Sequence, residues 1–171
     1  AELKLSPATK SYGNGVFSYC SKLTSVVLPD GLTAVVDSMF MQCANLASVT
    51  IPDSVTAIGP RAFGYCKNLP AVTIPEGVTV IDDYAFNSCA KLTSLRIPDK
   101  VTRIGKNAFY GATALTALSL GSSVETIDNF AFYNCKNLPV VVLPDSVKTL
   151  GTSAFNRCEK MQTITFGTGL E

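Results

Sequence analysis

Cysteines standing at a fixed distance after a phenylalanine are the residues of this sequence that could most obviously do chemistry. The stretch "AFNSC", Ala85 to Cys89, is one example, and the chain has six cysteines in 171 residues. A thiol in such a place could be a nucleophile, half of a disulfide or a metal ligand. The chain contains no histidine and no CxxC pair, so a catalytic thiol lacks its usual base and a metal lacks its commonest ligand. We therefore expect no enzymatic activity, no metal and no cofactor.

The cysteines belong to a repeat of 23 residues that runs through the whole sequence. Its phenylalanines are Phe17, Phe40, Phe63, Phe86, Phe109, Phe132 and Phe155, and the residues three places later are Cys20, Cys43, Cys66, Cys89, Ala112, Cys135 and Cys158. Apolar residues also recur six, nine and eleven places after each phenylalanine. This fixed register predicts a single domain over residues 1–171, made of seven units preceded by a partial N-terminal unit.

One unit has the pattern of a short coil. In "LASVTIP", Val49 and Ile51 are two residues apart, which is the period of a strand, and Pro52 cannot continue the ladder of hydrogen bonds. Residues 53–59 form an extended return segment. Residues 61–66 are too few for a full helix, so we expect one helical or 3₁₀ turn there.

A single coil of this kind cannot be stable alone, because its few inward side chains do not offset the entropy of ordering it. Stacked coils share a core, so we predict an α/β repeat solenoid with right-handed coiling. A parallel sheet should cover one face, and short helical or 3₁₀ turns with extended segments should cover the other. Gly59, Gly105 and Gly151 are expected at turns that need a positive φ. The last coil has no polar cap, which predicts a longer repeat array or end-to-end self-association.

The consensus "LxxVxIPxxVxxIGxxAFxxC" resembles the BspA-like, or Treponema-type, leucine-rich repeat. The resemblance covers residues 3–170 and implies the leucine-rich-repeat fold. It also implies a secreted or surface-anchored bacterial protein, located outside the cell or at its surface, and often used in adhesion to host or matrix proteins. The composition does not by itself indicate any of these roles.

The cysteines of such a solenoid should form one inward column. We interpret them as buried thiols that act as small apolar side chains. A disulfide framework is the alternative, because a secreted chain with an even number of cysteines invites one and neighbouring coils bring α-carbons within bonding range. The pairs would then be Cys20–Cys43, Cys66–Cys89 and Cys135–Cys158.

Two further columns each have two interpretations. An acidic column follows the strand-ending prolines and comprises Asp30, Asp53, Glu76, Asp99 and Asp145. Stacked carboxylates could bind calcium, but an acidic residue after proline also favours a turn, which is the reading we prefer. Tyrosines recur near the phenylalanines at Tyr19, Tyr65, Tyr110 and Tyr133. They could be binding anchors or, as we expect, could pack over the turn.

The outward side chains of the sheet are where a partner would contact this protein. Most are small, and the residues that we single out as a partner-binding set are Val27, Thr73, Arg96, Ser119, Val140 and Val142. The valines offer apolar surface, and Arg96 could bind a carboxylate. The net charge of +1 gives no attraction to nucleic acid, and no apolar run is long enough to span a membrane. We predict a non-enzymatic protein-interaction module, with a spacer array that presents another domain as the alternative.

Overall fold

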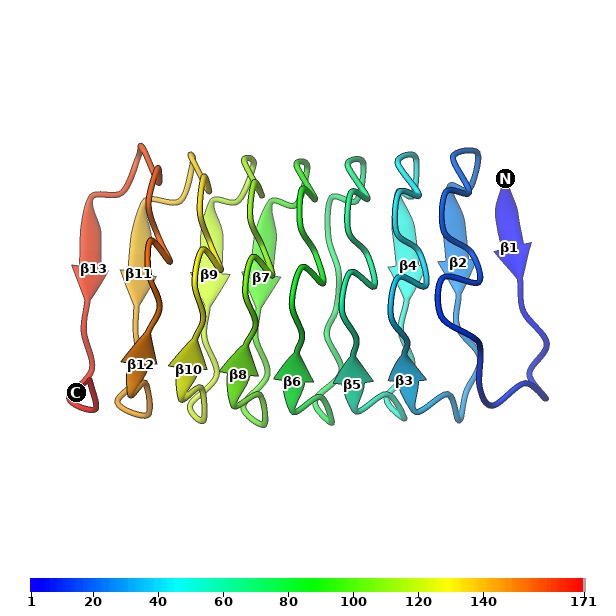
Figure 1. Cartoon of the computed structure of the whole chain (residues 1–171), viewed down its shortest axis with the longest axis horizontal. Coiled ribbons are helices and arrows are strands. Elements are labelled where there is room, and N and C mark those ends of the chain that lie inside the picture. The colour runs from blue at the N-terminus through cyan, green and yellow to red at the C-terminus, as the bar shows by residue number, and fades with distance from the viewer. Residues whose placement is uncertain (171) are drawn as a thin grey trace.

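The computed structural model describes residues 1–170 and shows a solenoid of about seven stacked coils (Figure 1). Along one face the coils contribute three-residue strands, except at residues 71–73, and the chain returns along the opposite face in two-residue strands. The first kind comprises β1 (Glu2–Lys4), β2 (Ser25–Val27), β4 (Ser48–Thr50), β7 (Ser94–Arg96), β9 (Ala117–Ser119), β11 (Val140–Val142) and β13 (Thr163–Thr165). The second comprises β3 (Ala34–Val35), β5 (Ala57–Ile58), β6 (Val80–Ile81), β8 (Arg103–Ile104), β10 (Thr126–Ile127) and β12 (Thr149–Leu150).

Each strand pairs in parallel with its equivalent in a neighbouring coil, so the 23-residue register of the sequence is also the register of the structure. Val26 pairs with Val49, and Ile58 pairs with Ile81. The return segments expected as merely extended form a continuous sheet of their own, in the order β12-β10-β8-β6-β5-β3. The coils are therefore joined by parallel pairing on both faces, continuous on the return face and divided into three sheets on the face of the three-residue strands.

The expectation of a helical or 3₁₀ turn around each phenylalanine is wrong, because residues 1–170 contain no helix and thus none that could span a membrane. Arg61 and Tyr65, on either side of Phe63, have φ angles of 52° and 62°. The N–H groups of Arg61, Phe63 and Tyr65 donate to carbonyls of the next coil at 2.6–3.0 Å, whereas those of Ala62 and Gly64 donate three residues back. A 3₁₀ helix would direct every N–H back along its own chain, so bonding between coils excludes it.

The glycines predicted to need a positive φ have a different role. Gly59, Gly105 and Gly151 are not among the residues with positive φ, most of which are not glycine. A Cβ atom on Gly151 would lie 2.3 Å from the backbone nitrogen of Asn129 in the preceding coil. These glycines are therefore required by close contact between coils rather than by the shape of a turn.

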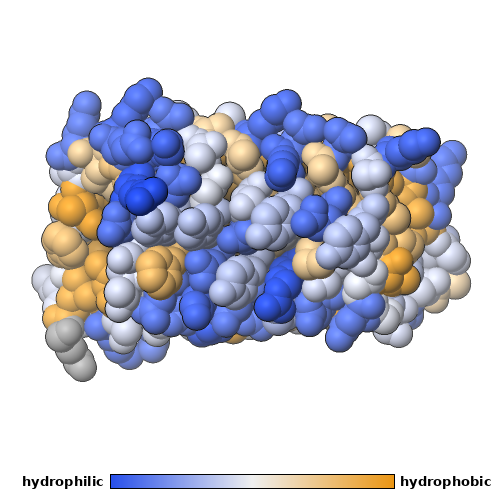
Figure 2. Space-filling view, turned by 45° about the horizontal axis from the view of Figure 1, so that its top comes forward, coloured by the Kyte–Doolittle hydropathy of each residue, from blue (hydrophilic) through white to orange (hydrophobic). Residues whose placement is uncertain are grey.

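The core is built around a continuous stack of phenylalanine rings. Neighbouring rings from Phe17 to Phe155 are stacked with centroids 5.2–5.6 Å apart. The five inner rings are fully buried, whereas Phe17 and Phe155 are half-buried, and each of these two has a stacked phenylalanine on only one side. Figure 2 shows the same contrast at the surface, where apolar side chains gather at the two ends and polar ones cover most of the length between them.

Candidate interaction surface

The cysteine column lies inside the solenoid for five of its six members. The buried thiols of Cys43, Cys66, Cys89, Cys135 and Cys158 each donate to the carbonyl of the phenylalanine in the preceding coil, at 3.1–3.5 Å. All six cysteines are free. Burial raises the pKa of Cys43 and Cys158 to about 11 and that of Cys89 to about 12. These thiols are therefore protonated at neutral pH and are poor nucleophiles and metal ligands.

The expectation that Cys20 shares this buried column is wrong, because Cys20 is exposed. The coil ahead of it is incomplete and supplies no phenylalanine carbonyl, so nothing covers the sulfur as the preceding coils cover the other five. Cys20 is consequently the thiol of this chain that solvent can reach.

The six residues singled out for partner binding all lie on the face of the three-residue strands with exposed side chains. Val27 is 58% exposed at the end of β2, and Val140 and Val142 are 44% and 59% exposed on β11. The buried Val141 lies between the last two and faces the core. Alternation along β11 thus presents two apolar side chains outward, as the sequence pattern predicts.

Arg96 is exposed but already has a carboxylate partner. Its guanidinium binds Glu76 through two nitrogen–oxygen contacts, of which Nη2–Oε2 is 3.4 Å. The pair is largely solvent-exposed, so it contributes little to stability. A carboxylate from a partner would therefore have to compete with Glu76 for Arg96. This pair could have been found in the sequence. Arg96 is 23 residues after Thr73, so the two residues occupy the same position in neighbouring coils, and Glu76 follows Thr73 by three residues.

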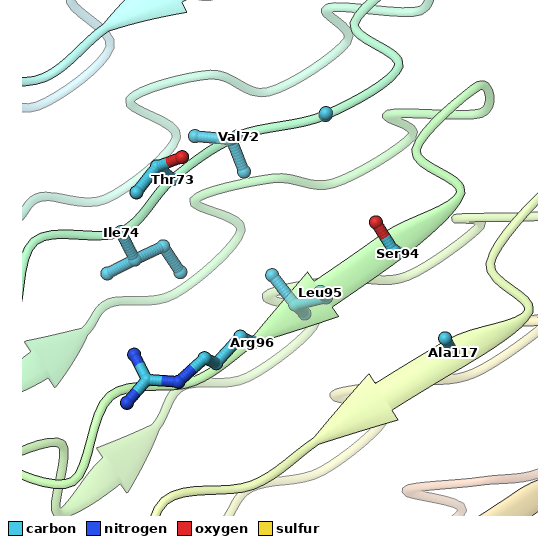
Figure 3. A pocket seen from close by; sticks show the side chains of 8 residues that line it. Val72, Thr73, Ile74, Ser94, Leu95, Arg96 and Ala117 are labelled. Atoms are coloured by element: carbon cyan, nitrogen blue, oxygen red, sulfur yellow. The ribbon is translucent and has the colours of Figure 1, made fainter.

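A shallow hollow of about 360 Å³ interrupts the sheet beside Arg96. Residues 71–73, which occupy the strand position between β4 and β7, are not paired with either strand. Pro70 precedes them and has no N–H, whereas Ala47 and Thr116 at the same position of the repeat donate to the preceding coil at 2.8 and 2.9 Å. Figure 3 shows Arg96 extending from β7 toward the neighbouring segment, with Thr73 and Ser94 on either side of the gap.

The same proline effect recurs at Pro139, where β9 and β11 belong to separate sheets. Neither break was expected from the sequence. The signal was present, because proline replaces threonine, alanine or glutamine at one column of the repeat in two units.

Acidic residues bind backbone and arginine rather than forming a cation site. Asp99 accepts hydrogen bonds from the backbone N–H of Ser122 at 2.9 Å and from its hydroxyl, and these bonds hold the pKa of Asp99 below its ordinary value. Asp145 likewise accepts from the N–H of Thr168 at 2.8 Å. Within the part of the chain that the structure describes, no cluster of three or more acidic or cysteine side chains could hold a metal ion. Glu76, Asp99 and Asp145 of the acidic column therefore make contacts between coils.

Arg103 forms a polar cluster that was not expected from the sequence. Its guanidinium binds Asp82, Asp83 and Asp128 at 2.7–3.2 Å on the face of the two-residue strands. These partners lie in the coils before and after that of Arg103, so the cluster joins three successive coils. The three carboxylates thus bind the guanidinium of Arg103.

The tyrosine column divides into packed and exposed members. Tyr110 and Tyr133 stack on each other with ring centroids 5.0 Å apart, as expected for packing over the turn. Tyr19 and Tyr65 are 64% and 41% exposed. The column is therefore not uniform, and its exposed members remain available for contacts.

The family model of the "BspA type Leucine rich repeat region" matches this sequence over residues 1–116 and 102–171, in six copies. The chain belongs to the BspA-type leucine-rich repeat family. The resemblance noted in the sequence is thereby confirmed, and the coils of the structure are the repeats of that family. BspA-type repeats are a scaffold for protein interaction.

Solved structures of bacterial leucine-rich repeat proteins have the same fold as this BspA-type chain. The Treponema pallidum leucine-rich repeat protein is 29% identical with a TM-score of 0.83, and the match covers 87% of this chain and 70% of that one. A leucine-rich cell surface protein from Faecalibacterium prausnitzii is 26% identical with a TM-score of 0.53, covering 88% and 62%. The pneumococcal vaccine antigen PcpA shares the fold at 23% identity and a TM-score of 0.59, covering 85% and 51%. No curated protein matches the sequence.

Proposed function

We propose that this chain is a non-enzymatic protein-interaction module of a secreted or surface-anchored bacterial protein, and that it contributes to adhesion to host or matrix proteins. The observation that carries the proposal is the outward pair Val140 and Val142 on β11, together with Val27 on the same face. Exposed apolar residues on an otherwise polar and small-residue face are typical of contact sites. A relative described as a cell surface protein supports the location outside the cell.

This face also has a hollow beside residues 71–73. Thr73 and Ser94 line it, and a side chain of a partner could enter it. Ser119 continues the same face on β9. The contact surface that we propose therefore runs across β2 to β11, with apolar groups near its ends and polar groups in its middle. Such a surface has few large anchors, so we expect weak single contacts that gain strength by repetition along an array.

The test is binding to a panel of purified host-matrix proteins by surface plasmon resonance. The variants are Val140→Ser combined with Val142→Ser and, separately, Arg96→Ser. Ala57→Ser combined with Thr149→Ser, on the opposite sheet, is the matched control. We expect the valine pair to weaken binding at least fivefold and the control to leave it unchanged. If the wild-type chain binds no panel member, or if all variants bind alike, the chain acts as a spacer array or uses another face.

A further inference from the structure

A small pocket on the face of the stacked turns is distinct from the sheet surface described above. It has a volume of about 250 Å³ and is lined by Met41, Arg61, Gly64, Tyr65, Tyr84 and Asn87. The hollow exists because Gly64 occupies a column that carries Met41, Asn87, Tyr110 and Tyr133 in neighbouring units. One missing side chain thus opens a cavity in the turn face.

Arg61 supplies this pocket with an uncompensated positive charge. Its guanidinium lies over the ring of Tyr84, with Cζ 5.2 Å from the ring centroid. Within residues 1–170 it makes no ion pair, whereas Arg96 and Arg103 are both bound to carboxylates. The acidic residue next to Tyr84 is Asp83, whose carboxylate is taken by Arg103 and by the N–H of Lys106. Stacking on an aromatic ring fixes a guanidinium while its edge stays free to donate two hydrogen bonds.

Asn87 supplies a second free donor. Asn87 lines the pocket, the residue is 6% exposed, and its Oδ1 accepts a hydrogen bond from the hydroxyl of Ser88 at 3.1 Å. Among the described residues its Nδ2 group donates to no protein acceptor. The Nδ2 nitrogen is not among the buried atoms that lack a partner, so it can be reached at the edge of the cavity and can donate to an acceptor on a ligand.

The remaining walls are apolar. Tyr65 is 41% exposed and Met41 is half-buried. The pocket therefore combines a flat aromatic side chain with donors from Arg61 and Asn87, and no carboxylate lines it. Its volume is below that of a drug-sized site, and it suits one ring-sized group that has an apolar face, several oxygens and a negative charge.

We propose that this pocket binds an acidic sugar, which is a pyranose ring that carries a carboxylate. The carboxylate pairs with the edge of the Arg61 guanidinium, a ring or hydroxyl oxygen accepts from Nδ2 of Asn87, and the C–H face of the ring lies against Tyr65. An acidic peptide side chain also offers a carboxylate, but it is narrower than the hollow and has no ring to cover the tyrosine. The glycan ligand is independent of the protein contacts assigned to the sheet face.

The experiment measures binding of methyl glucuronide by ligand-observed NMR titration, with methyl glucoside as the neutral counterpart and N-acetylglutamate amide as the peptide-like acid. Two variants remove the site, namely Arg61→Gln, which removes the charge, and Gly64→Asn, which fills the hollow. A Cβ at Gly64 meets its nearest backbone atoms at 3.4 and 3.5 Å, so the backbone accepts a side chain there. Gly64→Ala is the matched control for the second variant.

Arg157→Gln is the matched control for Arg61→Gln, because Arg157 also lies over a tyrosine ring, that of Tyr133 at 5.6 Å, but does not line this pocket. We expect the dissociation constant for methyl glucuronide to rise at least tenfold in Arg61→Gln and in Gly64→Asn and to change less than twofold in both controls. Methyl glucoside should bind at least tenfold more weakly than methyl glucuronide.

Three results would overturn the proposal. They are equal binding of glucuronide and glucoside, N-acetylglutamate amide binding as tightly as glucuronide, and unchanged binding in Arg61→Gln when its urea midpoint matches that of the wild-type chain. If Gly64→Asn alters the urea midpoint, the decision rests on Arg61→Gln and its control.

Discussion

The stack of phenylalanine rings should make the cost of a substitution depend on how many neighbours a ring has. Phe86 lies between Phe63 and Phe109 with both centroid distances at 5.2 Å, whereas Phe155 has one such neighbour, Phe132. Substitution by leucine keeps an apolar side chain and removes the stacking. An aromatic pair contributes about 0.5–1.5 kcal/mol beyond the burial of its area. Phe86→Leu should therefore lower the free energy of unfolding by about 1–3 kcal/mol and Phe155→Leu by about half as much.

Urea unfolding, followed by circular dichroism, measures these costs. If the slope of the unfolding free energy against urea concentration is unchanged, each variant exposes the same surface area on unfolding. A double-mutant cycle isolates the stacking. Phe86→Leu and Phe109→Leu should show a coupling energy of about 0.5–1.5 kcal/mol, whereas Phe40→Leu and Phe109→Leu, which are not neighbours, should be additive. Equal costs at Phe86 and Phe155, together with no coupling between Phe86 and Phe109, would refute the stacking argument.

Three further predictions concern the thiols and the exposed end. In the native chain Ellman's reagent should modify Cys20 alone, and the other five should react only in denaturant; more than one fast thiol would contradict the buried column. The free energy of unfolding should fall between pH 9 and 11, because unfolded thiols ionise near pH 8.5 while Cys43 and Cys158 keep their protons up to a pKa of about 11. Each such thiol contributes a slope of up to about 1.4 kcal/mol per pH unit, and alanine at these positions should flatten the pH profile of urea midpoints. Phe166, 55% exposed on the last coil, should support the end-to-end association expected from the sequence; sedimentation velocity should show a dimer that Phe166→Glu removes, and a monomer at all concentrations would exclude it.

The sequence predicted the register and the core because both follow from periodicity. The 23-residue spacing placed Phe40 to Phe132 and the apolar strand residues inside. The structure buries these phenylalanines fully and most of the strand residues wholly or in part, with Phe166 exposed. The conformation around the phenylalanines was not predictable from local pattern. Its positive φ angles at residues such as Ser38 and Asn134 serve hydrogen bonds to the next coil, and no window within one unit contains that partner. Hydrogen bonds between coils, rather than local sequence propensity, therefore determine the backbone conformation around the phenylalanines.

The candidate surfaces also combine features that the sequence predicted with features that depend on contacts between coils. The exposed valines were predicted from strand alternation, but two features arise from single exceptions within a column. Gly64 opens the pocket on the turn face, and Pro70 removes a bond between coils next to the sheet-face hollow. Both exceptions are visible when the units are aligned. The effect of each exception depends on the neighbouring coils, whereas the 23-residue register alone places Glu76 near Arg96.

The parallel ladders also determine how this chain should respond to mechanical force. The hydrogen bonds between coils run along the long axis, and the two termini lie at opposite ends of it (Figure 1). Tension applied between the ends would load these bonds in series, so coils should peel away one at a time. Each released unit would lengthen the chain by roughly 75 Å, as 23 residues pass from coil to extended chain. The coils that begin at Pro70 and Pro139 lack a strand-sheet bond to the preceding coil, so they are the places where an array of these repeats should yield first.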